Sequence, residues 1–120
     1  MTEFDRFKRA LALTETKDCP TAWGDEGRAC GRWQMHVDFC FDYRPGGVVV
    51  GETWDEYFDD CLKCFWLRHR GEADSMLAMA AIFHLGHWAW KRGDHDDEYL
   101  ERFQRNWAAL APETPKTEVS

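Results

Sequence analysis

The segment from Met76 to Leu85 is a nearly continuous run of apolar residues, and it limits the possible folds more than any other feature. No stretch of the chain reaches the roughly 20 apolar residues that a membrane-spanning helix needs, so we expect no membrane span. A short apolar helix in a small protein must instead be buried on most of its sides. We therefore predict a helix from Ser75 to about Trp90, capped by Asp74, at the centre of a mainly α-helical domain.

The first residues of the chain have the spacing of an amphipathic helix. Apolar side chains recur at intervals of three and four residues, at Phe4, Phe7 and Leu11. This spacing places them on one helix face, and Thr2 with Asp5 resembles an N-terminal cap. We predict a helix over about residues 3–15, which ends before Pro20 because the residue before a proline disfavours helical geometry.

Two later helices are marked by polar residues at their N-termini. Thr53 and Glu56 form a capping box that opens a helix to about Arg70. Its expected inward face is apolar and largely aromatic: Trp54, Phe58, Cys61, Leu62, Phe65 and Trp66. The acidic residues 96–98 begin a last helix, with another aromatic face expected inward: Tyr99, Leu100, Phe103 and Trp107.

The intervening segments are richer in glycine and proline. Residues 16–30 read as a long loop, and residues 31–43 as the place of a second helix. After the turn residues 44–47, residues 48–50 fit either a short strand or an extended link. The predicted fold class is mainly α, with at most a small β element.

Length and charge set further bounds. A chain of 120 residues is expected to form one domain, here residues 1–111, followed by a disordered polar tail over residues 112–120. The net charge of −7 argues against a nucleic-acid partner, because phosphate binding needs a basic surface. We expect a monomer. No secretory signal is visible at Met1–Ala10, so the compartment expected at synthesis is the cytoplasm.

The five cysteines do not form a recognisable metal or disulfide pattern. Their number is odd and no signal peptide accompanies them, which favours free thiols. Cys61 and Cys64 have zinc-ligand spacing, but they lie inside a predicted helix and lack a matching second pair. His84 and His87 are better explained as interior or cleft histidines than as ligands. We expect neither a metal site nor a cofactor, and a zinc module built on the cysteines is the weakest alternative.

Glu15 is the residue most suggestive of chemistry. It lies at the C-terminal end of the first predicted helix, where the helix dipole raises the pKa of a carboxyl, and burial would raise it further. A carboxyl that stays protonated near neutral pH can donate its proton to a glycosidic oxygen. Thr14 and Thr16 stand beside it as hydrogen-bond partners for the carboxyl group. The competing interpretation is a solvated acid at a helix end.

The residues that follow Glu15 carry a family resemblance. Glu15-Thr16, then the run Trp23-Gly24-Asp25-Glu26-Gly27-Arg28-Ala29-Cys30-Gly31-Arg32-Trp33-Gln34-Met35, resembles the core of g-type lysozymes and soluble lytic transglycosylases. The later helices are similar to those of short phage and prophage members, so the resemblance covers residues 5–107. It implies a lysozyme-like fold and cleavage of the β-1,4 MurNAc–GlcNAc bond of peptidoglycan. The implied ligand is peptidoglycan or a chitooligosaccharide-like glycan.

The resemblance also implies a role for individual residues. Glu15 would be the catalytic acid and later the base, oriented by Thr16, and Asp25 would position an attacking water. The sugar would contact residues on the cleft floor and on the central helix: Gly31, Trp33, Gln34, Met35 and His84. From the residues alone, Asp25 fits a loop brace equally well, and Gln34 fits a residue that bonds the loop backbone. The implied product is either a hydrolysed or a 1,6-anhydro sugar, and the implied place of action is the cell wall, after release or on a virion.

The central helix departs from the family pattern. Where the family has an aromatic-Asn pair followed by glycines, this chain has His84 and Leu85, then bulkier residues. The second hypothesis is therefore a lysozyme-fold protein that has lost turnover and binds a glycan or a protein partner. Of the tryptophans, we expect core positions for Trp54, Trp66 and Trp107. Trp23, Trp33 and Trp88 could stack on sugar rings, and Trp23 and Trp33 are left open between that role and the core.

Overall fold

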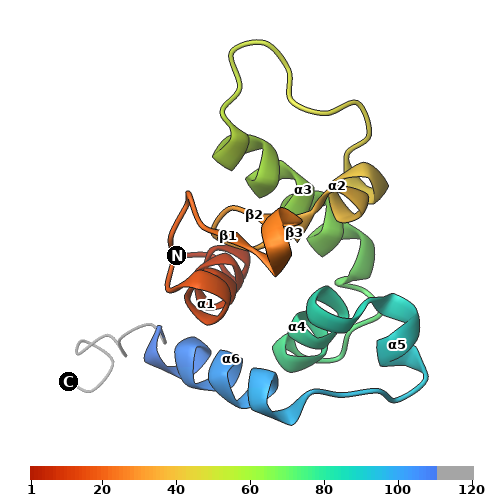
Figure 1. Ribbon diagram of the computed structural model, residues 1–120. Coiled ribbons are helices and arrows are strands. Elements are labelled where there is room, and N and C mark those ends of the chain that lie inside the picture. Colours follow the sequence, from red (N-terminus) through yellow and green to blue (C-terminus); the bar gives the residue numbers. More distant parts are fainter. Residues whose placement is uncertain (111–120) are drawn as a thin grey trace, which may run out of the picture.

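The computed structural model describes residues 1–110, and within them the chain is mainly helical (Figure 1). Six α-helices surround one small three-stranded sheet. The mainly α class with a small β element is thus confirmed for this part of the chain. The tail predicted at residues 112–120 lies outside the described residues.

Helix α1, Glu3–Thr16, begins where the sequence predicts. Thr2 accepts a hydrogen bond from the Asp5 backbone, and the Asp5 side chain accepts one from the Thr2 backbone, which completes the capping box. The helix ends when Lys17 adopts a left-handed conformation with φ of 55° and donates its backbone N–H to Leu13. Pro20 is thus not the direct cause of the helix end.

The segment predicted as a loop folds into the sheet. Its strands are β1 (Trp23–Gly24), β2 (Ala29–Cys30) and β3 (Met35–His36), with the short helix η1 (Asp25–Gly27) between the first two. Both pairings are antiparallel: Trp23 pairs with Cys30, and Cys30 with Met35. Residues 31–36 form a turn and the third strand, so the helix predicted within residues 31–43 is only α2, Val37–Tyr43.

Helix α3, Trp54–His69, confirms the predicted capping box at Thr53 and Glu56. Four residues of the predicted inward face are buried: Phe58, Cys61, Leu62 and Phe65. The core position expected for Trp54 is wrong, because this first helical residue is 65% exposed. The segment between α2 and α3 projects at the top of Figure 1 as an extended link without a strand, and its Val49 and Val50 are exposed.

The central apolar helix is shorter than predicted. Helix α4, Met76–Leu85, is capped by Ser75, whose side chain accepts from the Ala78 backbone, and not by Asp74. Gly86, with φ of 94°, breaks the helix, and a separate helix α5 covers His87–Lys91. Five consecutive α4 residues, 78–82, are buried, which confirms the central position of this helix.

Helix α6, Asp97–Ala109, packs along α1 (Figure 1). Its N-cap is Asp96, which accepts a hydrogen bond from the Tyr99 backbone. Phe7 and Phe103 meet edge to face with ring centroids 5.8 Å apart, and Asn106 donates to the Thr14 hydroxyl at 2.9 Å. Packing against α6 therefore holds in place the end of α1 that bears Glu15.

Gly31 is a position where the fold should tolerate no side chain. It is buried with φ of +85°, and a Cβ there would lie 2.8 Å from a ring carbon of Phe58, which is itself buried. We expect Gly27→Ala, at φ +86° in open space, to lose about 1 kcal/mol of unfolding free energy through backbone strain alone. Gly31→Ala should lose about 1–3 kcal/mol more because of the clash. Chemical denaturation of both variants measures the difference, and equal losses would contradict the packing described.

Candidate functional site

Five of the residues predicted to act on substrate line a single pocket of about 460 Å³. They are Glu15, Asp25, Gln34, Met35 and His84. The end of α1 contributes the acid, the small sheet and its turns contribute the floor, and the end of α4 contributes the opposite wall. Phe39 and Phe83 add an apolar side to the pocket. Residues far apart in the sequence thus converge around one carboxyl group.

Glu15 has the electrostatic property that a general acid needs. It lies in the last turn of α1, and its partial burial raises its pKa to about 7, against the smaller opposing effect of the Arg102 guanidinium on α6. About half of the molecules would therefore hold this carboxyl protonated at neutral pH. The carboxyl accepts no hydrogen bond from another side chain within the described residues, so burial is what keeps the proton on it.

Asp25 lies at the more open rim of the same pocket. Its side chain is 50% exposed, and one carboxylate oxygen lies 3.2 Å from Nε2 of His36. The other oxygen is 3.7 Å from the Arg28 guanidinium. Asp25 and Glu26 both have left-handed backbone conformations, with φ of 49° and 57°. The tight turn therefore places the Asp25 carboxylate in contact with solvent. The Glu15 carboxyl is less exposed to solvent than that of Asp25.

Gln34 braces the floor of the pocket. Its amide Nε2 donates to the backbone oxygens of Gly31 at 3.0 Å and Ala22 at 3.3 Å. Its amide oxygen lies against Gly24, where a Cβ would clash with it. The hydrogen bonds agree with the structural interpretation of this residue, while its place in the pocket wall leaves contact with a ligand open.

Three predicted site residues do not line the pocket: Thr16, Gly31 and Trp33. The hydroxyl of Thr16 donates to the backbone oxygen of Arg32 at 2.8 Å, so it fastens the loop to α1 and does not orient Glu15. Thr14, the other candidate partner, donates to the Ala10 oxygen instead. Both hydroxyls therefore bond backbone oxygens, that of Thr14 within α1 and that of Thr16 in the loop.

Trp33 is part of the core. Its side chain is buried, and the indole N–H donates to the Lys8 backbone oxygen at 2.9 Å, so its ring is not available to stack on a sugar. Gly31 is buried against Phe58, which gives it a packing role. Of the tryptophans that could stack on sugar, Trp23 and Trp88 are exposed.

Sequence reasoning missed Tyr99 as a member of the site. Its ring stacks on His84 with centroids 3.7 Å apart, and burial together with the Glu15 carboxylate raises the pKa of its hydroxyl. Within the described residues this hydroxyl is buried without a hydrogen-bond partner. On its other side His84 pairs with Asp96 through Nε2 at 2.9 Å. In the sequence Tyr99 is one of several periodic aromatics on α6, which indicates only a core position.

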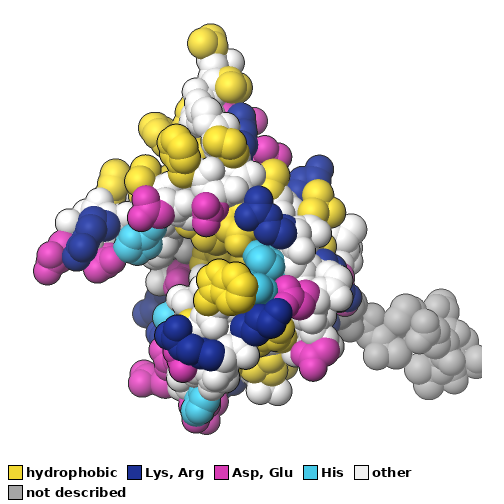
Figure 2. Space-filling view, turned by 90° about the vertical axis from the view of Figure 1, so that its right-hand side faces the viewer, with side chains coloured by type: hydrophobic (Ala, Val, Ile, Leu, Met, Phe, Trp, Pro, Cys, Tyr) yellow, Lys and Arg dark blue, Asp and Glu magenta, His cyan; other side chains and the backbone are white. Residues whose placement is uncertain are grey.

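A larger apolar cavity of about 700 Å³ adjoins this pocket. The two share Met35 and His36, and the larger one extends between the exposed rings of Trp23, Phe41 and Trp54. Figure 2 shows hydrophobic side chains gathered over the upper part of the molecule, around the link between α2 and α3. The Glu15 pocket and this larger, partly aromatic groove therefore lie side by side.

Cys30 and Cys40 line the larger cavity, but the cysteines form no metal-ligand group within the described residues. All five are free; Cys40 and Cys61 are buried, and Cys19 is exposed. In the described range 1–110, no group of three potential metal ligands includes a cysteine. The zinc module built on Cys61 and Cys64 therefore lacks the further ligands that such a site would need.

None of the helices in the described part of the chain is long and apolar enough to cross a membrane. Comparison of the chain with protein-family models, with curated proteins and with solved structures gave no match.

Proposed function

We propose that this protein cleaves the glycan strand of peptidoglycan, with Glu15 as the general acid. The observation that carries the proposal is a carboxyl with a pKa of about 7, placed in a pocket with Asp25, Gln34 and His84. Such a group holds its proton in about half of the molecules at neutral pH, and it faces a space that a sugar can enter. The lysozyme-like fold that the sequence resembles remains part of this proposal.

The chemistry requires one proton and one nucleophile. Glu15 gives its proton to the glycosidic oxygen as the bond between that oxygen and C1 breaks. In hydrolysis, a water adds to C1 and passes its proton to the Asp25 carboxylate. Proton exchange with solvent then returns Asp25 and Glu15 to their starting states. In the anhydro route, the sugar's own 6-hydroxyl attacks and Glu15 takes up its proton. Asp25 has a role only in the first route, so the products distinguish the two.

The groove beside the pocket supports a polymeric ligand. An extended glycan needs contacts on several successive rings, and the apolar faces of sugars pack against aromatic side chains. Trp23 and Trp54 are exposed along the larger cavity, which shares His36 as a lining residue with the Glu15 pocket. The same groove favours the second candidate, a lysozyme-fold protein that binds glycan without turnover. Leu85, in place of the family's asparagine, is the residue that motivates it.

Two measurements separate these candidates. Incubation with purified peptidoglycan, followed by mass spectrometry of the released fragments, is expected to yield muropeptides with reducing or 1,6-anhydro ends. Titration with a chitooligosaccharide should shift the NMR signals of Gln34, His36 and Trp23. Binding without release would replace the first candidate by the second. If neither release nor any shift in the groove is seen, both are wrong.

A further inference from the structure

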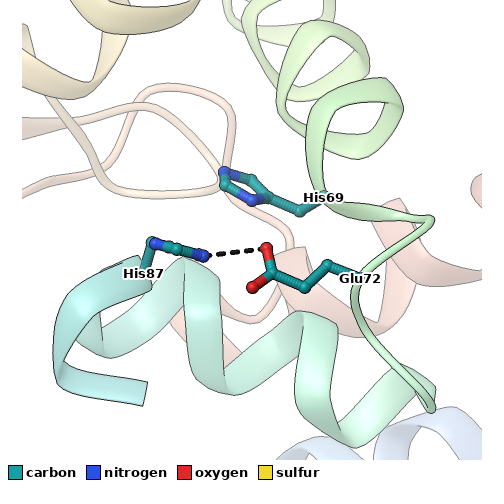
Figure 3. Close-up of side chains that lie close together, drawn as sticks. All are labelled: His69, Glu72 and His87. Carbon is teal, nitrogen blue, oxygen red and sulfur yellow. Dashed lines mark hydrogen bonds and ion pairs between the residues drawn. The ribbon is translucent and has the colours of Figure 1, made fainter. Parts of the chain in front are cut away.

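A second group of polar side chains lies outside the Glu15 pocket, at the junction of three segments. His69 ends α3, Glu72 lies in the turn that follows, and His87 begins α5 (Figure 3). Each offers one ligand atom, and these three atoms lie within 4.8 Å of one another. They face a cavity of about 770 Å³, so an ion and water from solvent can reach them.

The orientation of the three side chains leaves one potential ligand atom of each directed toward the other two. Nε2 of His69 is hydrogen-bonded to the Tyr43 hydroxyl at 2.7 Å, so Nδ1 is the nitrogen left to bind a ligand. In Figure 3 one ring nitrogen of His69 points toward the Glu72 carboxylate. Nε2 of His87 approaches the same carboxylate at 2.8 Å. All three groups therefore converge on one point.

We propose that His69, Glu72 and His87 bind a divalent transition-metal ion of the zinc class. Two imidazoles and one carboxylate are a ligand set that zinc accepts, with a fourth position left for water. The contact between His69 and Tyr43 supplies the outer hydrogen bond that usually orients a ligating histidine. With Nδ1 on the metal, Nε2 carries the proton and donates it to the Tyr43 oxygen.

An ion pair between His87 and Glu72 alone does not explain the arrangement. His69 is buried, and its ring stacks on that of His87 with centroids 5.3 Å apart. Two imidazoles therefore face one carboxylate, an arrangement that a single divalent ion would bridge.

The proposed site is separate from the Glu15 pocket. The two cavities share Phe39 and Phe83, but none of the three proposed ligands lines the Glu15 pocket. The metal would join the end of α3 to the start of α5, two helices that α4 separates along the chain. The inference therefore stands whether or not Glu15 is catalytic.

Metal-free protein, kept reduced with a phosphine, is the material for the test. Calorimetric titration with Zn²⁺ is expected to give one site per chain, and saturating Zn²⁺ should raise the melting temperature. Glu72→Gln and His87→Ala should each weaken binding by at least about tenfold, and Tyr43→Phe by up to about tenfold through loss of the outer hydrogen bond. Circular dichroism of each variant verifies that it folds. In ¹⁵N NMR spectra of the histidine rings, the addition of Zn²⁺ should change the chemical shift of Nδ1 of His69.

The matched control is His95→Ala, because His95 pairs with Asp97 at 2.9 Å without a third ligand and its loss should leave Zn²⁺ affinity unchanged. Titration with Co²⁺ checks for the competing thiols, since thiolate ligation produces an intense near-ultraviolet band that imidazole and carboxylate do not. The proposal is overturned by absence of stoichiometric binding, by a thiolate band, or by unchanged affinity in Glu72→Gln and His87→Ala.

Discussion

Glu15→Gln is expected to stabilise the folded protein above neutral pH. The pKa of Glu15 rises from an ordinary 4.5 to about 7 on folding, because burial disfavours the charged form. Between these two values the unfolded chain loses this proton and the folded chain keeps it. The free energy of unfolding therefore falls as pH rises from about 4.5 to about 7, and then levels off. Glutamine removes that loss, which amounts to about 3 kcal/mol at most.

Urea denaturation of wild type and variant at pH 4 and pH 8 measures this effect. The gain in stability should be seen at pH 8 and be nearly absent at pH 4, where wild-type Glu15 is protonated in both states. Glu101→Gln is the control, because Glu101 is exposed on the same helix as Arg102 and should show no such gain. An equal gain at both pH values would mean that the pKa of Glu15 is not raised by folding.

The same substitution is expected to abolish cleavage of peptidoglycan. Glutamine matches glutamate in shape, but its amide is not acidic enough to donate a proton to the leaving oxygen. General acid catalysis contributes about 10²–10⁴-fold in rate. Wild-type activity should decline as pH rises through about 7, because the protonated fraction of Glu15 falls there. Fragment release over a pH series, with Glu101→Gln as control, provides both results.

Stability and activity together separate a catalytic Glu15 from a structural one. A catalytic acid whose pKa is raised by burial should yield a variant that is more stable and inactive. A variant that loses both properties would assign Glu15 to the packing of α1. A variant that gains stability and still releases fragments would remove Glu15 from the proposed mechanism.

The helices that the sequence predicts best are those with a local cap. Thr2 and Asp5 mark the start of α1, and Thr53 and Glu56 that of α3, because each pair satisfies backbone groups only three residues away. The end of α4 at Gly86 could not be placed in the same way. A glycine within an apolar helical pattern is often tolerated, and only the packing around it decides whether the helix breaks.

The small sheet and its turn could not be predicted either, because they too depend on contacts between distant residues. Its strands are two residues long, too short for an alternating pattern, and Gln34 adopts a left-handed conformation with φ of 52° in the middle of a segment that otherwise suits a helix. Tight turns stabilised by side-chain bonds to distant backbone, as Gln34 makes to Ala22, are set by tertiary contacts.

The site was predictable in outline and not in detail. The resemblance to g-type lysozymes and lytic transglycosylases implied that Glu15, Asp25 and Gln34 lie together, and they line one pocket. The residues next to Glu15 in the sequence did not predict which side chains surround its carboxyl. Thr16 bonds Arg32 instead, whereas Tyr99 approaches Glu15 from α6. The group of His69, Glu72 and His87 shows the same limit, because its members meet only after α4 has folded back.

The packing of α6 against α1 has a consequence for the order of folding. The Arg6 guanidinium donates to the Trp107 backbone oxygen at 2.8 Å, a contact between residues 101 positions apart. Closing a loop of that length carries a large entropic cost, so such contacts form late. During synthesis Glu15 is made well before α6, the helix that packs along α1. The acid would therefore stay hydrated, with an ordinary pKa, until α6 has been made and has packed against α1.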